Sequence, residues 1–348
     1  MPLRPLYGHE ELRRRFLGAI ASGRLPQAIL LEGPRGVGKQ RFGLWLAQAL
    51  LCEGDRGAAN PCGTCQPCKL VLDLSHPDLH WIVPIEVTRK GADADTQVDL
   101  AEEALAEEMA ARREQPLYQP PSGLASHGIA SARLLSRHLR LTPAMARHKF
   151  FLVGDAERLV AQRANPEAAN ALLKGLEEPP SNTVLVLTTS EPEALLPTVL
   201  SRVVRVRMAR LPDSVMTQFG QQELGTATQL TLEQRVASSE GSIGRLLAED
   251  SGQRDGSGVE AVLAASRRSP ADRYALALKQ PPFQARGAFT ALLDDLLKRL
   301  RADARAGRET RAAVRAMVRV LDAREMAQGN VNPQLLAAVM VDGLWSDA

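Results

Sequence analysis

The chain has 348 residues, of which 45% are hydrophobic and 24% charged, a composition typical of an ordinary soluble globular protein with two or three domains. Its formal net charge of +3 is too small to establish nucleic-acid binding by itself. No apolar run reaches the length of a membrane span, and the first eleven residues lack the apolar core of a signal peptide, so we expect a cytoplasmic protein without a membrane partner.

The first predicted elements surround a glycine-rich loop. Residues 3–24 contain a short predicted helix, and the apolar run at 28–31 predicts a buried parallel strand. Apolar residues at helical spacing over 42–50 predict a second helix. Between strand and helix lies the pattern G-x-x-x-x-G-K, typical of a phosphate-binding loop, formed by Gly33, Pro34, Arg35, Gly36, Val37, Gly38, Lys39 and Gln40. Such glycines let successive N–H groups point at phosphate oxygens where a helix begins.

One position of this loop departs from the pattern. Lys39 is expected to reach the terminal phosphates of a nucleotide, and the next residue is normally Ser or Thr, whose hydroxyl holds Mg²⁺. Here that residue is Gln40, a longer neutral amide. We therefore expect a nucleotide-binding fold that lacks one usual metal ligand; the alternative is a chance glycine-rich turn.

The four cysteines form one cluster with the spacing C-x9-C-x2-C-x2-C, made of Cys52, Cys62, Cys65 and Cys68. Four thiolates suit tetrahedral Zn²⁺, and the two short spacings let turns present sulfur atoms to one ion. Because no coordination position is left for a substrate, the predicted zinc site is structural. Free cysteines, a labile redox cluster and an iron–sulfur cluster are the alternatives.

The composition changes after a predicted strand at 79–83, which ends at Pro84. Residues 86–127 are predicted to form an insertion, with an acidic, alanine-rich helix over 98–113 and then a loop or disordered link rich in Pro, Ser and Gly. Because this segment carries no motif of a chemical site, we expect a charged surface insertion.

Helices and strands alternate again after the insertion, which predicts an α/β domain with a parallel sheet. The predicted elements are a helix at 132–139, a buried strand at 149–155, a helix at 168–178 that ends before Pro179 and Pro180, and strands at 183–189 and 203–208.

The end of the strand at 149–155 carries a second candidate for the site. In P-loop ATPases this strand ends in an Asp that helps to hold Mg²⁺, often followed by a Glu that positions the attacking water. Here Gly154 takes the place of the first acid and Asp155 the place of the second. Asp155 is therefore a candidate binding residue, and a polar strand end without that role is the alternative.

Beyond residue 210 the chain is predicted to be helical, with a linker at 251–258. Three apolar stripes at helical spacing are expected to form the core of a helical bundle. The stripes consist of Phe289, Leu292, Leu293, Leu296, Leu297 and Leu300; of Val314, Met317, Val318 and Leu321; and of Leu335, Leu336, Val339 and Met340.

Several motifs stand in an order that one family shares. They are Arg24-Leu25-Pro26-Gln27-Ala28, the phosphate loop, the four cysteines, His76-Pro77-Asp78, the segment ANALLKGLEEPP at 169–180, and Leu200-Ser201-Arg202. Through them the chain resembles the clamp-loader AAA+ subunits of bacterial DNA polymerase III over residues 5–208. The resemblance implies an AAA+ domain at 1–210 that includes a zinc module at 52–68, a helical lid at 211–255 and a helical collar for oligomerisation at 256–348.

Within this family the chain is most similar to the delta-prime subunits. The motor subunits, gamma and tau, carry a loop ending in Ser or Thr, an Asp-Glu pair, and a second sensor arginine where this chain has Gly244, one position before Arg245. Gln40, Gly154 and Gly244 therefore imply a stator-like subunit in which ATP or ADP can bind without turnover. The alternative is a gamma/tau-like motor that tolerates Gln40.

The resemblance also implies a role for two further residues and a set of partners. Arg202 would be an arginine finger that reaches the ATP of a neighbouring subunit, and Thr189 would end a sensing strand. The implied partners are the delta and gamma/tau subunits of a heteropentameric ring, with the sliding clamp and primed DNA reached through the complex. For Arg202 the alternative is an idle surface arginine in a nucleotide-independent scaffold.

Overall fold

The computed structural model describes residues 3–54, 61–86, 93–114, 125–159, 173, 175–177, 179–224, 231–250, 257–280, 289–307, 310–327 and 331–345. The chain divides into two compact units, one made of Met1–Gln119 with Ser126–Gln253 and one centred on Arg254–Ala348. The domain boundary predicted near residue 210 falls inside the first unit and stays a prediction. Among the helices that the structure describes, none is long and apolar enough to cross a membrane.

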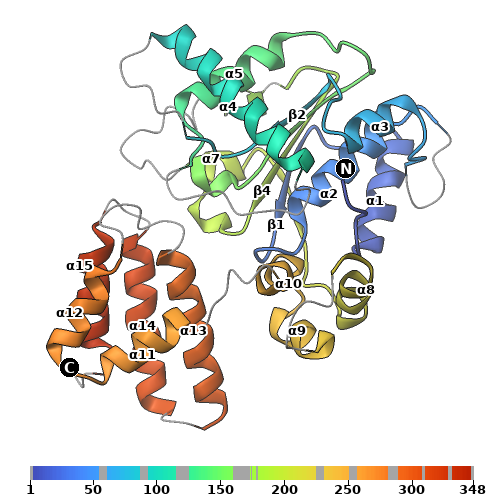
Figure 1. Ribbon diagram of the computed structural model, residues 1–348. Coiled ribbons are helices and arrows are strands. Elements are labelled where there is room, and N and C mark those ends of the chain that lie inside the picture. Colours follow the sequence, from blue (N-terminus) through green and yellow to red (C-terminus); the bar gives the residue numbers. More distant parts are fainter. Residues whose placement is uncertain are drawn as a thin grey trace. The chain divides into compact units, whose positions relative to one another are not determined.

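The first unit is built on a five-stranded sheet in the order β2-β3-β4-β1-β5 (Figure 1). The strands are β1 (Ala28–Glu32), β2 (Leu79–Ile82), β3 (Lys149–Val153), β4 (Thr183–Thr189) and β5 (Val204–Arg207). All pairings are parallel, so the carboxyl ends of the strands meet at one edge, where Glu32 lies opposite Thr189. The predicted parallel sheet is thereby confirmed.

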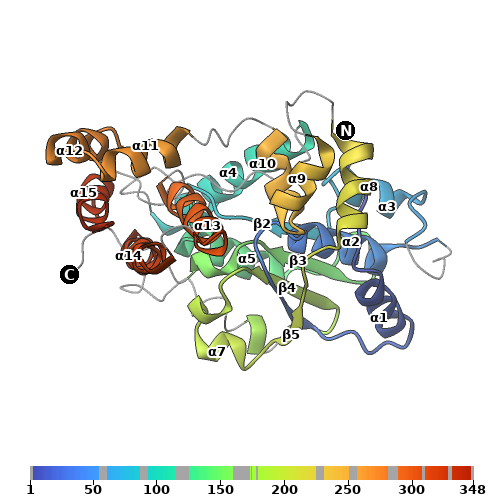
Figure 2. The same ribbon diagram turned by 90° about the horizontal axis from the view of Figure 1, so that it is seen from below.

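The two faces of the sheet carry separate apolar cores, because successive side chains of a strand point to opposite faces. Ile29 and Phe150 belong to one core, and the next residues along the same strands, Leu30 and Phe151, belong to the other. Figures 1 and 2 show helices on both sides of the strands. The first core is covered by α1 (Glu10–Ala21), α2 (Lys39–Leu51) and α3 (Gln66–Leu72), and the second by α5 (Ile129–Arg140) and α7 (Pro197–Leu200).

The helix of the insertion, α4 (Ala94–Glu114), is longer and more buried than the sequence suggests. Ala101 is fully buried, Leu105 packs against both cores, and the helix runs against α5. The exposed charged residues along this helix agree with the expectation of a charged surface insertion, and its buried face makes it part of the folded unit. The flanking stretches 87–92 and 115–124 lie outside the described residues.

Several element ends differ from the prediction because of backbone conformation. Helix α1 ends at Ala21, where Gly23 adopts φ +66° and donates its N–H to the oxygen of Ile20, a conformation that stops a helix. Strand β3 ends at Val153 rather than at 155, because Asp155 has φ +50° and cannot continue an extended strand.

Two predicted segments lie largely outside the described residues. Of the helix expected at 168–178, the structure describes 173 and 175–177, which are helical. Of the linker expected at 251–258, only its last two residues are described, and they begin α11.

Asp78 fixes the approach to β3 through its carboxylate. Its side chain accepts hydrogen bonds from the N–H groups of Ala144, Met145 and Ala146 at 2.6, 2.8 and 2.6 Å. Burial raises the pKa of Asp78, but these three donors outweigh it, so the pKa lies below its usual range. One residue thus ties the start of β2 to the segment before its neighbouring strand β3.

Three short helices form a small core of their own at the end of the first unit. They are α8 (Asp213–Glu223), α9 (Leu232–Ser239) and α10 (Ile243–Asp250). Met216, Phe219 and Leu246 are buried among them together with Tyr7 from the N-terminal segment. The ring of Tyr7 meets Phe219 edge-on at 5.1 Å, and its hydroxyl donates to Glu223 at 2.7 Å, which ties the start of the chain to α8.

The second unit consists of helices packed on one another (Figure 1). The described helices are α11 (Ser257–Ser266), α12 (Pro270–Leu278), α13 (Thr290–Arg305), α14 (Thr310–Ala327) and α15 (Pro333–Gly343). Leu293, Leu296 and Leu300 of α13 are buried in its core, as the first apolar stripe predicts.

The other two apolar stripes are only partly core: Leu336 and Met340 are buried in the core and Met317 packs against it, but the remaining members are not. Val314, Val318 and Leu321 are exposed on α14, and Leu335 and Val339 are exposed on α15. The buried face of α14 is instead formed mainly by alanines, because they allow the close approach of α13. An apolar stripe therefore remains on the surface of each helix, which a single chain does not cover within the described residues.

Asp78→Ala is expected to destabilise the first unit by roughly 2–4 kcal/mol, because three N–H groups lose a charged acceptor. Urea unfolding followed by tryptophan fluorescence, with the exposed Asp73→Ala as control, measures the loss. Since the folded-state pKa of Asp78 is depressed, its contribution is present at neutral pH and is lost as the pH falls through that pKa. The difference in unfolding free energy between wild type and Asp78→Ala should therefore disappear in acid. Equal stability of the two proteins at pH 7 would contradict the stabilising role of Asp78.

Candidate functional site

The phosphate loop lies at the carboxyl edge of the sheet, between β1 and α2. Gly33 begins it with its N–H directed at the oxygen of Thr189, 3.3 Å away. A side chain at Gly33 would place its Cβ 2.2 Å from the backbone oxygen of Met208, so only glycine fits between the strands. Gly38, with φ +93°, stands immediately before α2 and leaves the N-terminus of that helix facing the loop.

Lys39 is held over this loop by three hydrogen bonds. Its Nζ donates to the backbone oxygens of Gly33 and Pro34 at 2.8 and 2.9 Å and to the hydroxyl of Ser190 at 2.8 Å. Burial lowers the pKa of Lys39 to about 8, although Glu157 and Asp155 oppose that shift. The ammonium is therefore charged at neutral pH and lies where a phosphate group would meet the loop.

Gln40 occupies the space that the residue at 154 leaves open. Its Nε2 donates to Asp155 at 3.1 Å, and its Oε1 accepts the indole N–H of Trp81 at 3.1 Å. A Cβ at Gly154 would lie 2.7 Å from Oε1 and 2.9 Å from Nε2 of Gln40. The two departures from the ATPase pattern, Gln40 and Gly154, are thus sterically matched.

The residues after β3 form a small polar group under the loop. Asp155 adopts φ +50°, which an Asp tolerates better than most residues, and its N–H donates to Thr188 at 3.1 Å. Glu157 accepts the N–H of Ser190 at 3.3 Å; burial, then the charge of Asp155, raises its pKa. The buried His127 pairs with the oxygen of Gly154 at 2.6 Å. The backbone oxygen of Gly154 and the backbone N–H of Asp155 are therefore each bound by a side chain.

Thr189, which the resemblance places at the end of a sensing strand, and its neighbour Ser190 have different surroundings. Thr189 is fully buried, and its hydroxyl accepts the N–H of Glu191 at 3.1 Å. Ser190, directly after it, lines the cavity and binds Lys39. The sequence analysis did not identify Ser190. Its position directly after the end of β4, at the edge where the phosphate loop lies, could have indicated it.

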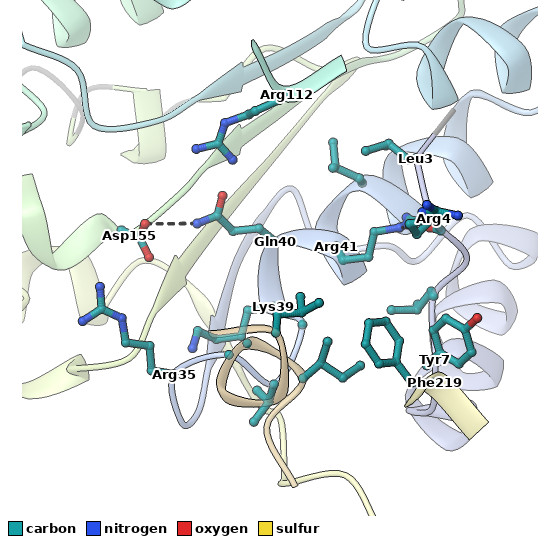
Figure 3. Close-up of a pocket in the computed structure, with 18 of the residues that line it drawn as sticks. Leu3, Arg4, Tyr7, Arg35, Lys39, Gln40, Arg41, Arg112, Asp155 and Phe219 are labelled. Carbon is teal, nitrogen blue, oxygen red and sulfur yellow. Dashed lines mark hydrogen bonds between the residues drawn. The ribbon is translucent and has the colours of Figure 1, made fainter. Parts of the chain in front are cut away.

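A cavity of about 250 Å³ adjoins the loop. The residues from Arg35 to Gln40 and Asp155 line it, whereas Gly33, Pro34 and Thr189 do not. In Figure 3, the loop and its cations lie on one side, and Leu3, Tyr7 and Phe219 lie on the other. Residues that sequence analysis did not foresee also line it, namely Leu3, Arg4, Trp81, Glu108, Arg112 and Leu247.

Helix α10 is attached directly to the loop. Ser242 donates its hydroxyl to the oxygen of Arg35 at 2.9 Å, and the N–H of Gly244 donates to the oxygen of Gly36 at 3.0 Å. A Cβ at Gly244 would lie 2.8 Å from the Cα of Gly36, so no arginine fits there without moving the backbone. Arg245 pairs instead with Glu240 at 2.5 Å.

The four cysteines converge on one point between α2 and α3. Their Sγ atoms all lie within 4.8 Å of one another, and the closest pairs, Cys62 with Cys68 and Cys65 with Cys52, are 3.9 and 4.0 Å apart. A tetrahedral ion with metal–sulfur bonds of about 2.3 Å sets sulfur atoms about 3.8 Å apart. The cluster therefore can hold a metal ion.

The local backbone prepares this cluster for a cation. The N–H groups of Cys65 and Thr64 lower the pKa of Cys62 to about 5, which favours the thiolate that a metal binds, whereas burial raises the pKa of Cys52 and of Cys68. Gly54 has no room for a side chain, since its Cβ would lie 2.7 Å from the sulfur of Cys62. All four cysteines are free of disulfides, which agrees with the ligand role.

Arg202 lies away from the cavity of its own chain, between α7 and β5. It is exposed and is not among the residues that line the cavity. Its Nη2 forms an ion pair with Glu177 at 2.8 Å, and its Nη1 donates to the oxygen of Thr198 at 2.9 Å. The side chain is therefore held on the surface, with Glu177 as its partner within this chain.

The match between Gln40 and Gly154 predicts a double-mutant cycle. Gly154→Asp alone should destabilise the first unit, because Gln40 must leave its bonds to Asp155 and Trp81. Gln40→Thr alone leaves the indole N–H without its acceptor. Together the two changes should cost less than their sum, with a coupling of about 0.5–3 kcal/mol in thermal unfolding. Strictly additive costs would contradict the steric match.

Comparison with known proteins agrees with this geometry. A family model described as "DNA polymerase III, delta subunit" matches residues 8–212. The delta-prime subunit of Bacillus subtilis is 33% identical over 184 residues, covering 53% of this chain and 42% of that protein. The delta-prime subunit of Pseudomonas aeruginosa is 33% identical over 178 residues, covering 51% and 42%. A gamma/tau subunit of Mycobacterium tuberculosis is 28% identical over 210 residues, covering 60% and 29%.

These alignments span less than half the length of each relative. The family model, in contrast, matches more than half of this chain. The chain therefore belongs to the DNA polymerase III delta-subunit family, as a clamp-loader subunit similar to delta prime.

Proposed function

We propose that this chain acts as a delta-prime-like stator of a clamp loader, which loads a sliding clamp onto primed DNA without turning over ATP in its own site. Its partners would be the delta and gamma/tau subunits, and its location the cytoplasm. The observation that carries the proposal is the match between Gln40 and Gly154. Two positions that hold Mg²⁺ in P-loop ATPases are here a glutamine and a glycine, and the glutamine amide lies where a side chain at 154 would begin.

The loss of turnover follows from the donor atoms of the site. Mg²⁺ takes oxygen ligands in near-octahedral geometry. The amide oxygen of Gln40 already accepts the indole N–H of Trp81, and Gly154 offers no carboxylate. Gly244, packed on the loop, likewise leaves no room for a sensor arginine. A gamma/tau-like motor, the alternative, would need these positions to rearrange together.

Arg202 is the residue that we propose acts on a neighbour. Its position between α7 and β5 gives it a base fixed by the sheet, and its side chain lies outside its own cavity. An arginine finger must be delivered from a rigid base to the phosphates of another subunit. Because Arg202 is paired with Glu177 here, reaching a partner requires exchanging that carboxylate for a phosphate group.

The helical parts would serve assembly. We assign α8–α10 to a lid that bears on the phosphate loop, and α11–α15 to a collar. The exposed stripes support the collar assignment: Val318 is 53% exposed and Val339 65% exposed. Covering such apolar residues by neighbouring subunits would stabilise a ring, at roughly 25 cal/mol per Å² of apolar surface removed from water.

We further propose that the metal of the cysteine cluster is zinc in a structural role. Four thiolates with sulfur separations near 4 Å suit its tetrahedral preference, and they leave no position open for substrate. Bound there, the ion would hold the end of α2 to the start of α3 through Cys52 and Cys68.

The test of the stator role is a ring reconstituted from this chain with delta and gamma subunits. Arg202→Ala should leave assembly intact but reduce clamp loading at least tenfold, since an arginine finger is worth on the order of 10³–10⁵ in rate at its site. Bulk ATPase should fall less, because only one neighbouring site is affected. Arg202→Lys should not restore clamp loading, because the ammonium of lysine lacks the planar guanidinium that pairs with two phosphate oxygens.

Arg207→Ala, which removes an exposed arginine from β5, serves as the matched control and should load clamps like wild type. Full clamp loading by the Arg202→Ala ring would reduce this chain to a passive scaffold. ATP turnover by the isolated chain that disappears in Lys39→Ala would favour the motor alternative instead.

Protein purified without chelator is expected to contain one zinc per chain by elemental analysis. Cys65→Ser should lose the metal and loosen residues 61–72, while the parallel sheet stays folded, because Val71 and Leu72 are the members of this segment in the first core. Hydrogen exchange resolved by peptide locates the loosening. Metal-free protein with unchanged protection over 61–72 would overturn the zinc proposal.

A further inference from the structure

The insertion helix α4 supplies a buried cation to the cavity beside the phosphate loop. Arg112 is only 9% exposed, and together with Glu108 and Ala111 it lines the cavity. Figure 3 shows its guanidinium directed toward Gln40, with Gln40 between Arg112 and Lys39. A charged group that is nine-tenths buried at a cavity wall calls for an anion or a paired acid.

Two contacts hold this guanidinium in place. It lies over the ring of Trp81 at 4.5 Å from the ring centre, and its Nε pairs with Glu108 at 2.9 Å, one turn earlier on α4. The same Trp81 donates its N–H to Gln40. The orientation of Arg112 is therefore coupled to the residue that replaces the metal ligand, and little freedom is lost when the guanidinium meets a ligand.

The charges around the cavity favour a polyanion. Arg4, Arg35, Lys39, Arg41 and Arg112 line it, against the acids Glu108 and Asp155; Arg4 is paired with Glu223 and Arg112 with Glu108. Arg41 is half-buried and donates to the backbone oxygen of Arg4 at 2.6 Å. An excess of cations in a small cavity raises the local affinity for negatively charged ligands.

The opposite side of the cavity is apolar. Leu3, Leu6, Phe219, Ile243 and Leu247 line it. A ligand that joins a polyphosphate to a flat, weakly polar ring would satisfy both sides. At the two positions that supply Mg²⁺ ligands in P-loop ATPases no free oxygen remains, because the amide of Gln40 is already paired at both ends and Gly154 has no side chain.

We propose, on the basis of the function proposed above, that this cavity binds a nucleoside polyphosphate in its metal-free form, with Arg112 of the insertion holding the phosphate chain together with the loop. The guanidinium takes over the charge that Mg²⁺ supplies in P-loop ATPases, and its fork can pair with two phosphate oxygens. Arg112 is thereby a binding residue, and the insertion is what makes a metal-independent site.

The experiment is a titration of the isolated full chain with fluorescent ADP, in excess EDTA and in excess Mg²⁺, with ATP and pyrophosphate as competitors. Wild type should bind at least as tightly in EDTA as in Mg²⁺. Arg112→Gln should weaken binding roughly 10- to 100-fold, the loss of a charge-assisted pair. Arg133→Gln, which removes an exposed arginine from α5, should bind like wild type.

Thermal unfolding of each variant shows whether the fold is kept, and the comparison of EDTA with Mg²⁺ on wild type needs no variant at all. Binding that requires Mg²⁺, an Arg112→Gln affinity equal to wild type in a folded chain, or no binding of any probe would each overturn the proposal. If pyrophosphate competed as well as ADP, the proposal that the cavity also binds the nucleoside of the ligand would be overturned.

The clamp-loading assay separates this proposal from the proposed function. A chain that supports loading in the ring but binds no probe contradicts the metal-free site and leaves the stator role standing. A chain that binds ADP in EDTA through Arg112 but fails in the ring supports the site and contradicts the stator role.

Discussion

The hydrogen-bonded amide of Gln40 is the interaction on which the binding edge of this protein depends. It joins Trp81 on β2, Asp155 after β3 and the first turn of α2, three elements that the parallel sheet brings to one edge. It lies where a Cβ at residue 154 would come within 2.7 Å of its Oε1, so a larger residue there would displace the amide. Where an ATPase would place a hydroxyl, a carboxylate and an ion, this chain has an amide that is paired at both ends, with Trp81 and with the carboxylate of Asp155.

Two elements from outside the sheet close around that network. Helix α10 binds the loop through Ser242 and Gly244, and α4 adds Arg112 above Trp81. The close approach of α10 to the loop requires glycine at 36 and at 244. The guanidinium of Arg112 lies over the flat ring of Trp81. The contacts from Ser242 and Gly244 hold the loop in one conformation, which preorganises it for a ligand.

The features suited to partners lie elsewhere on the chain. Arg202 is anchored at the surface beside Glu177, and the second unit keeps apolar side chains of α14 and α15 in solvent. An exposed apolar stripe is costly for an isolated chain, and an exposed ion pair contributes little to its stability. Both are explained if they serve contacts that form only in a complex, as the proposed ring requires.

Sequence alone determined the elements whose signals are local. The phosphate loop, the strands around it and the four cysteines were all predicted, because they depend on short spacings and on the periodicity of apolar residues. The family likewise followed from motifs in order along the chain. The apolar stripe of α13 was correctly placed in a core for the same reason.

Only the tertiary structure decided the relations between distant residues. Gln40 and Gly154 each look like a lost function in the sequence, and their steric match appears only when β1 and β3 share a sheet. Arg112 gave no signal, because its role depends on where α4 packs. Val318 and Val339 follow the pattern of core residues, yet alanines elsewhere on α14 allow closer packing and leave these valines outside. Periodicity shows that a helix has an apolar face, but packing decides whether its own chain or another covers it.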